Sequence, residues 1–277
     1  MGADIKQIRN RIRSVDSTLH VTRAMQLVAS SKIRRAAEAS ASTTEYASAL
    51  RRVLSDILST DTAKSPFLSP PKTGIRCTVL IAGDRGMAGG YNSSVFRLFE
   101  EDPEALSGFV LPIGRRALDY CERRGYRILS ADYPSSERIT ESQVSSLASL
   151  LTTSYSEHKF DSLYVIGTRL VNVLTQEAEC HRLLPLSPAE IPRRQVLYEP
   201  SGEAVLSAAI PSYLTALLLS TLRESFLSEL YARRNAMDSA SKNAGEMIEG
   251  LRLSYNRARQ SSITQEITEI VAGAGSQ

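Results

Sequence analysis

The feature that most constrains the fold of this chain is its N-terminal stretch. Residues 3–58 contain no proline and no glycine, the two residues that most disfavour a helix interior. Apolar residues step by three and four near its start and again near its end, as in a heptad seam. The two sets are Ile5, Ile8, Ile12, Val15 and Leu19, then Tyr46, Leu50, Val53 and Ile57. Such a helix would be roughly 80 Å long, so its own domain cannot bury it alone.

A different pattern begins after the Ser/Pro/Gly-rich segment Thr60–Gly74, which ends the helix. Short β-branched runs alternate there with helical stretches, such as 93–101 and 115–124. The runs lie at 77–83, 109–114, 126–131 and 162–167, and residues 163–186 favour two further strands that can form a hairpin. This order predicts an α/β fold: a small Rossmann-like domain with a largely parallel sheet.

Helical sequence returns from about Glu203 to Ala272, with Pro211 near its beginning or at a bend. Helices at both ends of one compact insert can match their apolar seams only if they run antiparallel. The sequence therefore predicts a long antiparallel coiled coil of the N- and C-terminal helices around the central domain. The expected domains are residues 1–60 (first helix), 74–200 (α/β domain) and 203–277 (second helix).

The two terminal helices cannot match ends, because the second is longer. Pairing Ile57 with roughly Ile210 places Ile5 near Ser262 if both helices rise equally. Everything after Ile263 then overhangs. The exposed apolar residues of this tip need a socket; they are Ile263, Ile267, Ile270 and Val271.

Composition excludes several classes of protein. The 277 residues are 42% hydrophobic and 23% charged, with a formal net charge of +3, which is typical of a soluble chain of one or two domains. Basic residues cluster between Lys6 and Arg35, but the small net charge disfavours a nucleic-acid partner. We find no leader-like segment and expect no apolar run long enough to span a bilayer. Any membrane association is expected through partners.

The sequence offers no active site. Its three cysteines, Cys77, Cys121 and Cys180, are far apart, which predicts buried thiols in a reducing compartment rather than a zinc site or disulfides. The stretch AGDRGMAGGYN (82–92) follows a strand, but its glycine spacing favours a structural or protein-contact loop over a phosphate site. The isolated histidines His20, His158 and His181 complete no catalytic or metal motif. We expect no catalytic residue, no cofactor and no metal.

The stretches VTRAMQLVASSKIRRA, DRGMAGGYN and NAGEMIEGLRLSYNRARQSSITQEITEIVAGAG resemble the gamma subunits of F-type ATP synthases, of the bacterial kind without the chloroplast regulatory insert. The resemblance covers nearly the whole chain in order and is weakest at 101–159. It implies a non-catalytic rotor shaft that couples proton flow to ATP synthesis or hydrolysis in the beta subunits. Whether the coupling ion is a proton or sodium stays open.

The resemblance also implies partners and a location. In this family the tip sits in a sleeve at the top of a hexameric ring of alpha and beta subunits. The α/β part sits below the ring with the epsilon subunit, on the ring of c subunits. The chain would then be peripheral on the cytoplasmic face of the cell membrane, with no direct membrane span and no nucleic acid.

The same resemblance implies coupling residues. Arg23 and Met25 match a segment that relatives place against a beta-subunit loop. Four polar positions of the second helix match contacts with the catch region of the ring: Arg233, Gln260, Thr264 and Glu266. A simpler interpretation makes Thr264 and Glu266 a solvated helix face and Met25 a core residue.

Two other functions stay open at this point. One is a nucleotide-binding enzyme built on the α/β part, which micromolar ATP binding would support. The other is a basic coiled-coil scaffold that binds nucleic acid or a membrane surface, which would show a strongly salt-dependent affinity for polyanions.

Overall fold

The computed structural model describes residues 2–58, 66–68, 74–186, 199 and 202–274. Residue contacts divide the chain into two compact units. The α/β unit is Ser30–Arg233, and the two-helix unit is Met1–Ala29 with Arg234–Gln277. Both long helices, α1 (Gly2–Leu58) and α6 (Gly202–Ala274), contribute residues to each unit. The domain boundaries expected above stay predictions.

The α/β unit is built on a five-stranded sheet with the strand order β3-β2-β1-β4-β5. The strands are β1 (Arg76–Ile81), β2 (Phe109–Ile113), β3 (Arg127–Ile128), β4 (Ser162–Leu170) and β5 (Gln176–Leu184). The first four pair in parallel, and β5 pairs antiparallel with β4. This confirms the largely parallel sheet, and the hairpin expected at 163–186 is β4–β5. All six residues of β1 are buried, as in a central strand covered on both faces.

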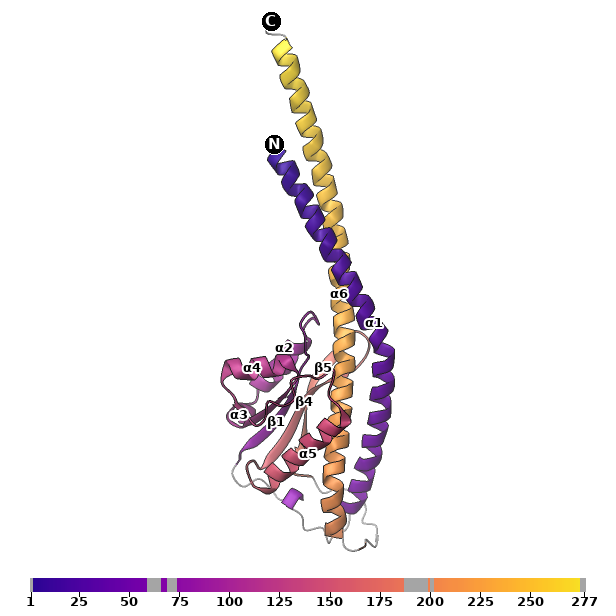
Figure 1. Cartoon of the computed structure of the whole chain (residues 1–277), viewed down its shortest axis with the longest axis vertical. Helices are drawn as coiled ribbons and strands as arrows, with labels where there is room; N and C mark the ends of the chain where they lie inside the picture. The colour runs from indigo at the N-terminus through magenta and orange to yellow at the C-terminus, as the bar shows by residue number, and fades with distance from the viewer. Residues whose placement is uncertain (1, 59–65, 69–73, 187–198, 200–201, 275–277) are drawn as a thin grey trace. The chain divides into compact units, whose positions relative to one another are not determined.

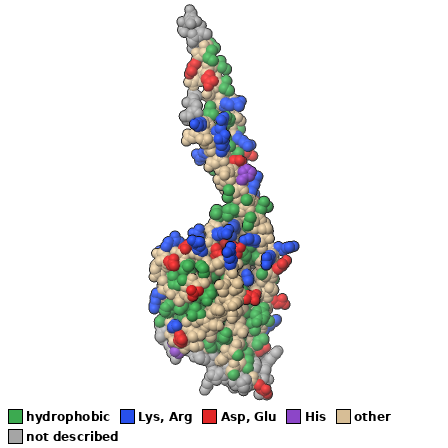
Figure 2. All heavy atoms as spheres, in the orientation of Figure 1, with side chains coloured by type: hydrophobic (Ala, Val, Ile, Leu, Met, Phe, Trp, Pro, Cys, Tyr) green, Lys and Arg blue, Asp and Glu red, His purple; other side chains and the backbone are tan. Residues whose placement is uncertain are grey.

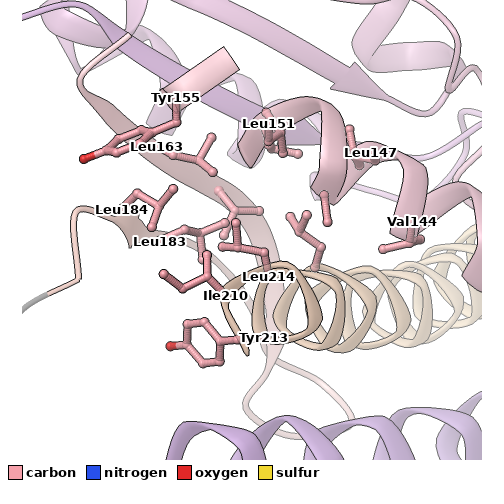
Figure 3. Close-up of a cluster of buried hydrophobic side chains, with 14 of the residues drawn as sticks. Val144, Leu147, Leu151, Tyr155, Leu163, Leu183, Leu184, Ile210, Tyr213 and Leu214 are labelled. Atoms are coloured by element: carbon pink, nitrogen blue, oxygen red, sulfur yellow. The ribbon is translucent and has the colours of Figure 1, made fainter. Parts of the chain in front are cut away.

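Helices cover both faces of this sheet (Figure 1). One face packs on α2 (Tyr91–Glu100), α3 (Pro103–Ser107) and α4 (Arg115–Arg124). The other packs on α5 (Glu141–Ser156) and on the parts of α1 and α6 that belong to this unit. In the larger core Val144, Leu147 and Leu151 of α5 face Ile210 and Leu214 of α6 (Figure 3).

Local signals explain where several of these elements begin and end. Thr140 and Gln143 form a reciprocal capping box at the start of α5. Gly125 ends α4 in the left-handed conformation, at φ 69°. Gly114, at φ 94°, lies so close to the backbone that a Cβ there would be 2.1 Å from the Ala82 carbonyl oxygen. Only glycine fits at this turn between β2 and α4.

In the α/β unit, the buried stripe of α1 differs from the predicted seam. Ala47, Leu54 and Ile57 are buried. Tyr46 and Val53, which were assigned to the seam, are 56% and 51% exposed, so that part of the prediction was wrong. Spacings of three and four fit two adjacent stripes equally well, and packing on the sheet and α6 selects between them.

In the two-helix unit, α1 and α6 run antiparallel and are joined by few apolar contacts. Leu19 packs with Ala244 and Ile248, with Val15 partly buried beside them. The remaining early seam residues, Ile5, Ile8 and Ile12, are only half-buried.

Polar side chains fix the register of this unit. Arg9 donates to the Tyr255 hydroxyl at 3.0 Å, and Gln26 donates to Asp238 at 3.1 Å. Each pair lies three residues from the equal-rise register predicted above, which is nearly one helical turn. Beyond the Arg9–Tyr255 pair, α1 has seven residues to Gly2 and α6 has nineteen to Ala274. About twelve residues of α6, roughly 18 Å, therefore overhang (Figure 1).

Two sequence expectations about burial need correction. By length and composition alone, one described helix could cross a membrane: an apolar window of 18 residues lies within 204–271 of α6. The expectation of no such run was wrong, although 56% of that window is buried inside the protein. The second concerns cysteine: Cys77 and Cys121 are buried as expected, but Cys180 is exposed because it lies on the edge strand β5.

Candidate functional site

The first candidate contact surface is the overhanging end of α6. Ile263, Ile267, Ile270 and Val271 are 44%, 56%, 70% and 66% exposed, and hydrophobic side chains follow this end of the helix in Figure 2. Burying a fully exposed side chain of this kind contributes about 1.5–3 kcal/mol, and each of these four would contribute the part that corresponds to its exposure. This end of α6 is therefore a candidate apolar contact surface.

The polar residues predicted on the same end share its exposure. Gln260, Thr264 and Glu266 are exposed, and their described hydrogen bonds are local to the helix. Thr264 donates to the Gln260 carbonyl at 2.9 Å, and Ser262 donates to Glu266 at 3.3 Å. The structure thus brings these three residues together with the apolar tip.

The second candidate surface lies further along the two-helix unit. Arg23 is exposed, Met25 is half-buried, and Arg23 lines a polar groove with Gln26, Asp238 and Lys242. Lys242 donates to Asp238 and, although partial burial opposes it, this bond lowers the pKa of the carboxyl. The groove therefore carries charges of both signs at neutral pH.

The structure places Arg233 differently from the other predicted contact residues. Its side chain is only 12% exposed and forms an ion pair at 2.5 Å with Glu229, which is 5% exposed. The same nitrogen of Arg233 donates to the Gly86 carbonyl at 3.3 Å. Burial raises the pKa of Glu229, and the Arg233 charge opposes that shift. Arg233 therefore holds a loop of its own domain instead of lying open on the surface.

That loop, residues 82–92, leaves the carboxyl end of β1 beside the carboxyl end of β4. In a parallel sheet with this strand order, β2 and β3 lie on one side of β1 and β4 lies on the other, so the strand order reverses between β1 and β4. Ligands of such folds bind at the crevice there. In this protein a segment of α6 occupies the position. A Cβ on Gly83 would lie 2.7 Å from a Glu229 carboxylate oxygen, and Tyr91 donates to the Ser225 carbonyl at 3.0 Å.

Asp84 anchors the same loop on its other side. Its carboxylate accepts from the Ser135 hydroxyl at 2.7 Å, the Ser136 amide at 2.8 Å, the Ser136 hydroxyl at 3.2 Å and the Glu137 amide at 3.3 Å. Burial opposes ionisation, but these hydrogen bonds prevail and lower the pKa of Asp84. Asp84 is thus a structural anion.

This arrangement disfavours phosphate at the loop. The Gly83 amide, a natural phosphate donor, already donates to the Asn92 side chain at 2.9 Å, and the Glu229 carboxylate repels anions. Among the described residues, no group of three His, Cys, Asp or Glu side chains could hold a metal ion.

Sequence reasoning missed Glu229 and Asp84. A signal existed for the first, because Glu229 stands among apolar residues four positions before Arg233, a spacing typical of helical ion pairs. No signal identifies the partners of Asp84, which come from a loop about fifty residues away.

Together, the exposed tip, the polar groove and the crevice filled by the protein's own helix define a subunit that works through contacts with other chains. A family profile described as ATP synthase matches residues 4–276. The chain is 38% identical to the ATP synthase gamma chain of Ruminococcus albus, over 97% of this chain and 96% of the relative. This protein belongs to the ATP synthase gamma chain family.

Other comparisons agree with that assignment. The chain is 34% identical to the gamma chain of Acetobacterium woodii described as sodium ion specific, over 99% of both chains. Its fold resembles a chain of the Euglena gracilis mitochondrial ATP synthase, with a TM-score of 0.70, 16% identity, and coverage of 100% of this chain and 95% of that one. A chain of the Tetrahymena thermophila central stalk and c-ring gives a TM-score of 0.60, with 20% identity and coverage of 80% and 99%.

Proposed function

We propose that this protein is the rotating central shaft of an F-type ATP synthase. It couples ion flow through the membrane sector to ATP synthesis or hydrolysis in the ring of alpha and beta subunits. The observation that carries the proposal is family membership over nearly the whole chain, from residue 4 to residue 276. The shaft is non-catalytic, and catalysis takes place in the beta subunits.

The structure supplies parts that suit a shaft. The antiparallel helices of the two-helix unit give a slim rod, and the apolar end of α6 extends beyond α1. Such a rod has no threefold symmetry, so it contacts each beta subunit of a ring differently. Because a contact shifts a conformational equilibrium only by its differential free energy, unequal contacts hold the catalytic sites in different affinity states. Rotation then exchanges those states.

The driving free energy comes from the membrane. One elementary charge moving through 100 mV releases about 2.3 kcal/mol. The shaft transmits, as torque, the free energy released by all the ions that cross during a rotation. One relative is described as sodium ion specific, and the same scheme applies to a proton or a sodium ion because each carries one elementary charge.

The partners follow from this role. The helical rod would contact the hexameric alpha–beta ring, and the α/β unit would contact the epsilon subunit and the c-ring. The protein would lie at the cytoplasmic face of the membrane as a peripheral subunit held by the complex.

Co-purification tests the proposal. Membranes are solubilised in mild detergent, the chain is isolated through a tag, and the associated proteins are identified by mass spectrometry. We expect alpha, beta, epsilon and c subunits in one complex that pumps ions when given ATP. Recovery of the chain with nucleic acid, or without those subunits, would contradict the proposal.

A further inference from the structure

The segment of α6 at the sheet edge is held by directional polar contacts as well as by apolar packing. The Thr168 amide donates to the Ser225 hydroxyl at 2.9 Å, and the Ser228 hydroxyl donates to the Thr168 carbonyl at 3.2 Å. Both serines are fully buried. One turn further along, Arg233 pairs with Glu229 and donates to the Gly86 carbonyl of the loop after β1 at 3.3 Å. The Glu229 carboxylate packs against Gly83 of the same loop, where a Cβ would lie 2.7 Å from its oxygen.

Glu229 and Arg233 both lie on α6, four residues apart, so their ion pair does not itself join the helix to the sheet. Its desolvation cost is of the same order as its Coulomb gain, so a well-packed apolar pair would give similar stability. What the ion pair does is hold the Arg233 guanidinium in place for its hydrogen bond to the Gly86 carbonyl, which crosses to the loop after β1. Apolar contact is non-directional, whereas hydrogen bonds weaken steeply away from linear geometry. These contacts therefore fix the angle of α6 about its own axis.

We propose that Glu229, Arg233 and the backbone of Gly83 and Gly86 form a torque latch. The latch makes α6 and the parallel sheet turn as one body. Glu229 and Arg233 are thus positioning residues for coupling: they act through the loop at 82–92 and need no contact with the catalytic ring. The inference rests on the proposed shaft function.

Four variants test the latch in the assembled complex. Glu229→Gln keeps the shape of the side chain and removes its charge. Arg233→Gln removes the opposite charge, whereas Arg233→Lys keeps a cation that can still donate to Glu229 and Gly86. Gly83→Ala disturbs the latch from the other side, because its Cβ would meet the flexible Glu229 carboxylate at 2.7 Å. Glu45→Gln is the matched control, since Glu45 is an exposed carboxylate on α1 of the same unit.

The measurement is ions pumped per ATP hydrolysed in reconstituted vesicles. We expect the ratio to fall in Glu229→Gln, Arg233→Gln and Gly83→Ala while the complex still assembles and hydrolyses ATP. The pumping ratio of Arg233→Lys should lie much closer to that of wild type than the ratio of Arg233→Gln does. The ratio of Glu45→Gln should equal that of wild type. Because Gly83→Ala acts through the Glu229 carboxylate, it should lower the ratio no further in a Glu229→Ala background.

The outcomes separate this inference from the shaft proposal. An unchanged pumping ratio in Glu229→Gln and Arg233→Gln, with only a lower unfolding temperature, would overturn the latch and leave the shaft role standing. The latch would also be overturned if Gly83→Ala lowered the number of ions pumped per ATP by the same factor in the Glu229→Ala background as in wild type. A wild-type chain that supports no pumping would count against the shaft role itself.

Discussion

Single side chains in this protein show how burial turns ordinary polar residues into structural ones. Asp84 accepts hydrogen bonds from both serines and the backbone of a distant loop. Arg233, which resemblance places on a contact surface, is turned inward by Glu229. The charge and hydrogen-bonding groups of these side chains can be read from the sequence, but tertiary packing decides which partners they bond.

Asp84 should make the stability of the chain sensitive to acid. Its folded pKa is lowered, so the stability it contributes is complete above the unfolded value of about 3.9 and is lost as pH falls through the folded pKa. We expect Asp84→Asn to lower the free energy of unfolding by about 1–3 kcal/mol at pH 7 and to flatten its decline in acid. Denaturant titrations of the purified chain across pH measure both. If the free energy of unfolding declined equally in acid for wild type and Asp84→Asn, this prediction would be contradicted. Glu122→Gln, at an exposed helical position, is the control.

Met25 tests the second contact surface at the level of one side chain. It is half-buried beside the exposed Arg23, so Met25→Lys adds a cation to a segment that is already charged. In a partly desolvated contact, the free energy of a new ion pair or repulsion changes with the rotational angle of the shaft. The added charge therefore stabilises one angle relative to the others.

We expect Met25→Lys to assemble and hydrolyse ATP but to pump fewer ions per ATP. Met25→Leu conserves volume and apolarity and should be nearly silent. Parallel assays in vesicles compare the two with wild type. Equal ratios in all three would remove Met25 from the coupling surface.

Among the helices and strands, those whose limits depend on local sequence pattern could be predicted from the sequence. The bounds of α1 and α4 follow from runs that lack helix breakers and from glycine at the ends of the shorter helix, whereas α6 continues through Pro211, Gly245 and Gly250. The strands of the sheet follow from β-branched runs. Pro112 stands within β2, which an edge position explains: β3 pairs only with Phe109 and Val110, so the missing amide hydrogen of Pro112 leaves no ladder bond unmade.

The limits of α3 and α5 were not predicted, because both helices lie in the stretch 101–159 where the resemblance was weakest, although Asp102 and Thr140 cap them locally. The register of α1 and α6 was misplaced by nearly a turn, because equal rise ignores which polar side chains meet. The exposure of the tip could be predicted, since it follows from the unequal lengths of two helices, whereas the inward position of Arg233 could not.

The overhanging end of α6 should matter more for assembly and torque than for folding. Deleting residues 267–277 removes exposed apolar side chains and leaves the helix pair around Leu19 and Ile248 intact. We expect a normal unfolding temperature for the isolated chain, weaker assembly with the ring and lower torque in single-molecule rotation, with ATP hydrolysis retained. Unchanged complex stability and pumping would show that the tip has no socket.

For the whole molecule, the filled crevice distinguishes this fold from nucleotide-binding folds of similar topology. The position where a parallel sheet commonly binds a ligand is taken by Glu229 and its neighbours on α6. The molecule therefore uses this position of its sheet for internal attachment, and its candidate contact surfaces lie on helices.

We accordingly expect the isolated chain neither to bind ATP at micromolar concentration nor to hydrolyse it. Isothermal titration and a phosphate-release assay on highly purified protein check the two statements. Turnover that co-elutes with the chain and survives removal of the alpha and beta subunits would contradict them.

The three cysteines differ in burial, so the protein can be labelled selectively at one of them without mutation. Cys77 and Cys121 are buried, and burial raises the pKa of Cys121 to about 12, so both should resist alkylation until the protein unfolds. Cys180 is exposed at the sheet edge and is the most accessible of the three, although burial of its thiol raises its pKa and its sulfur accepts a hydrogen bond from Arg76 at 3.1 Å. A maleimide should therefore modify the folded chain once, at Cys180, as peptide mass spectrometry can verify. A bead or fluorophore attached there would report rotation of the α/β unit without any engineered cysteine.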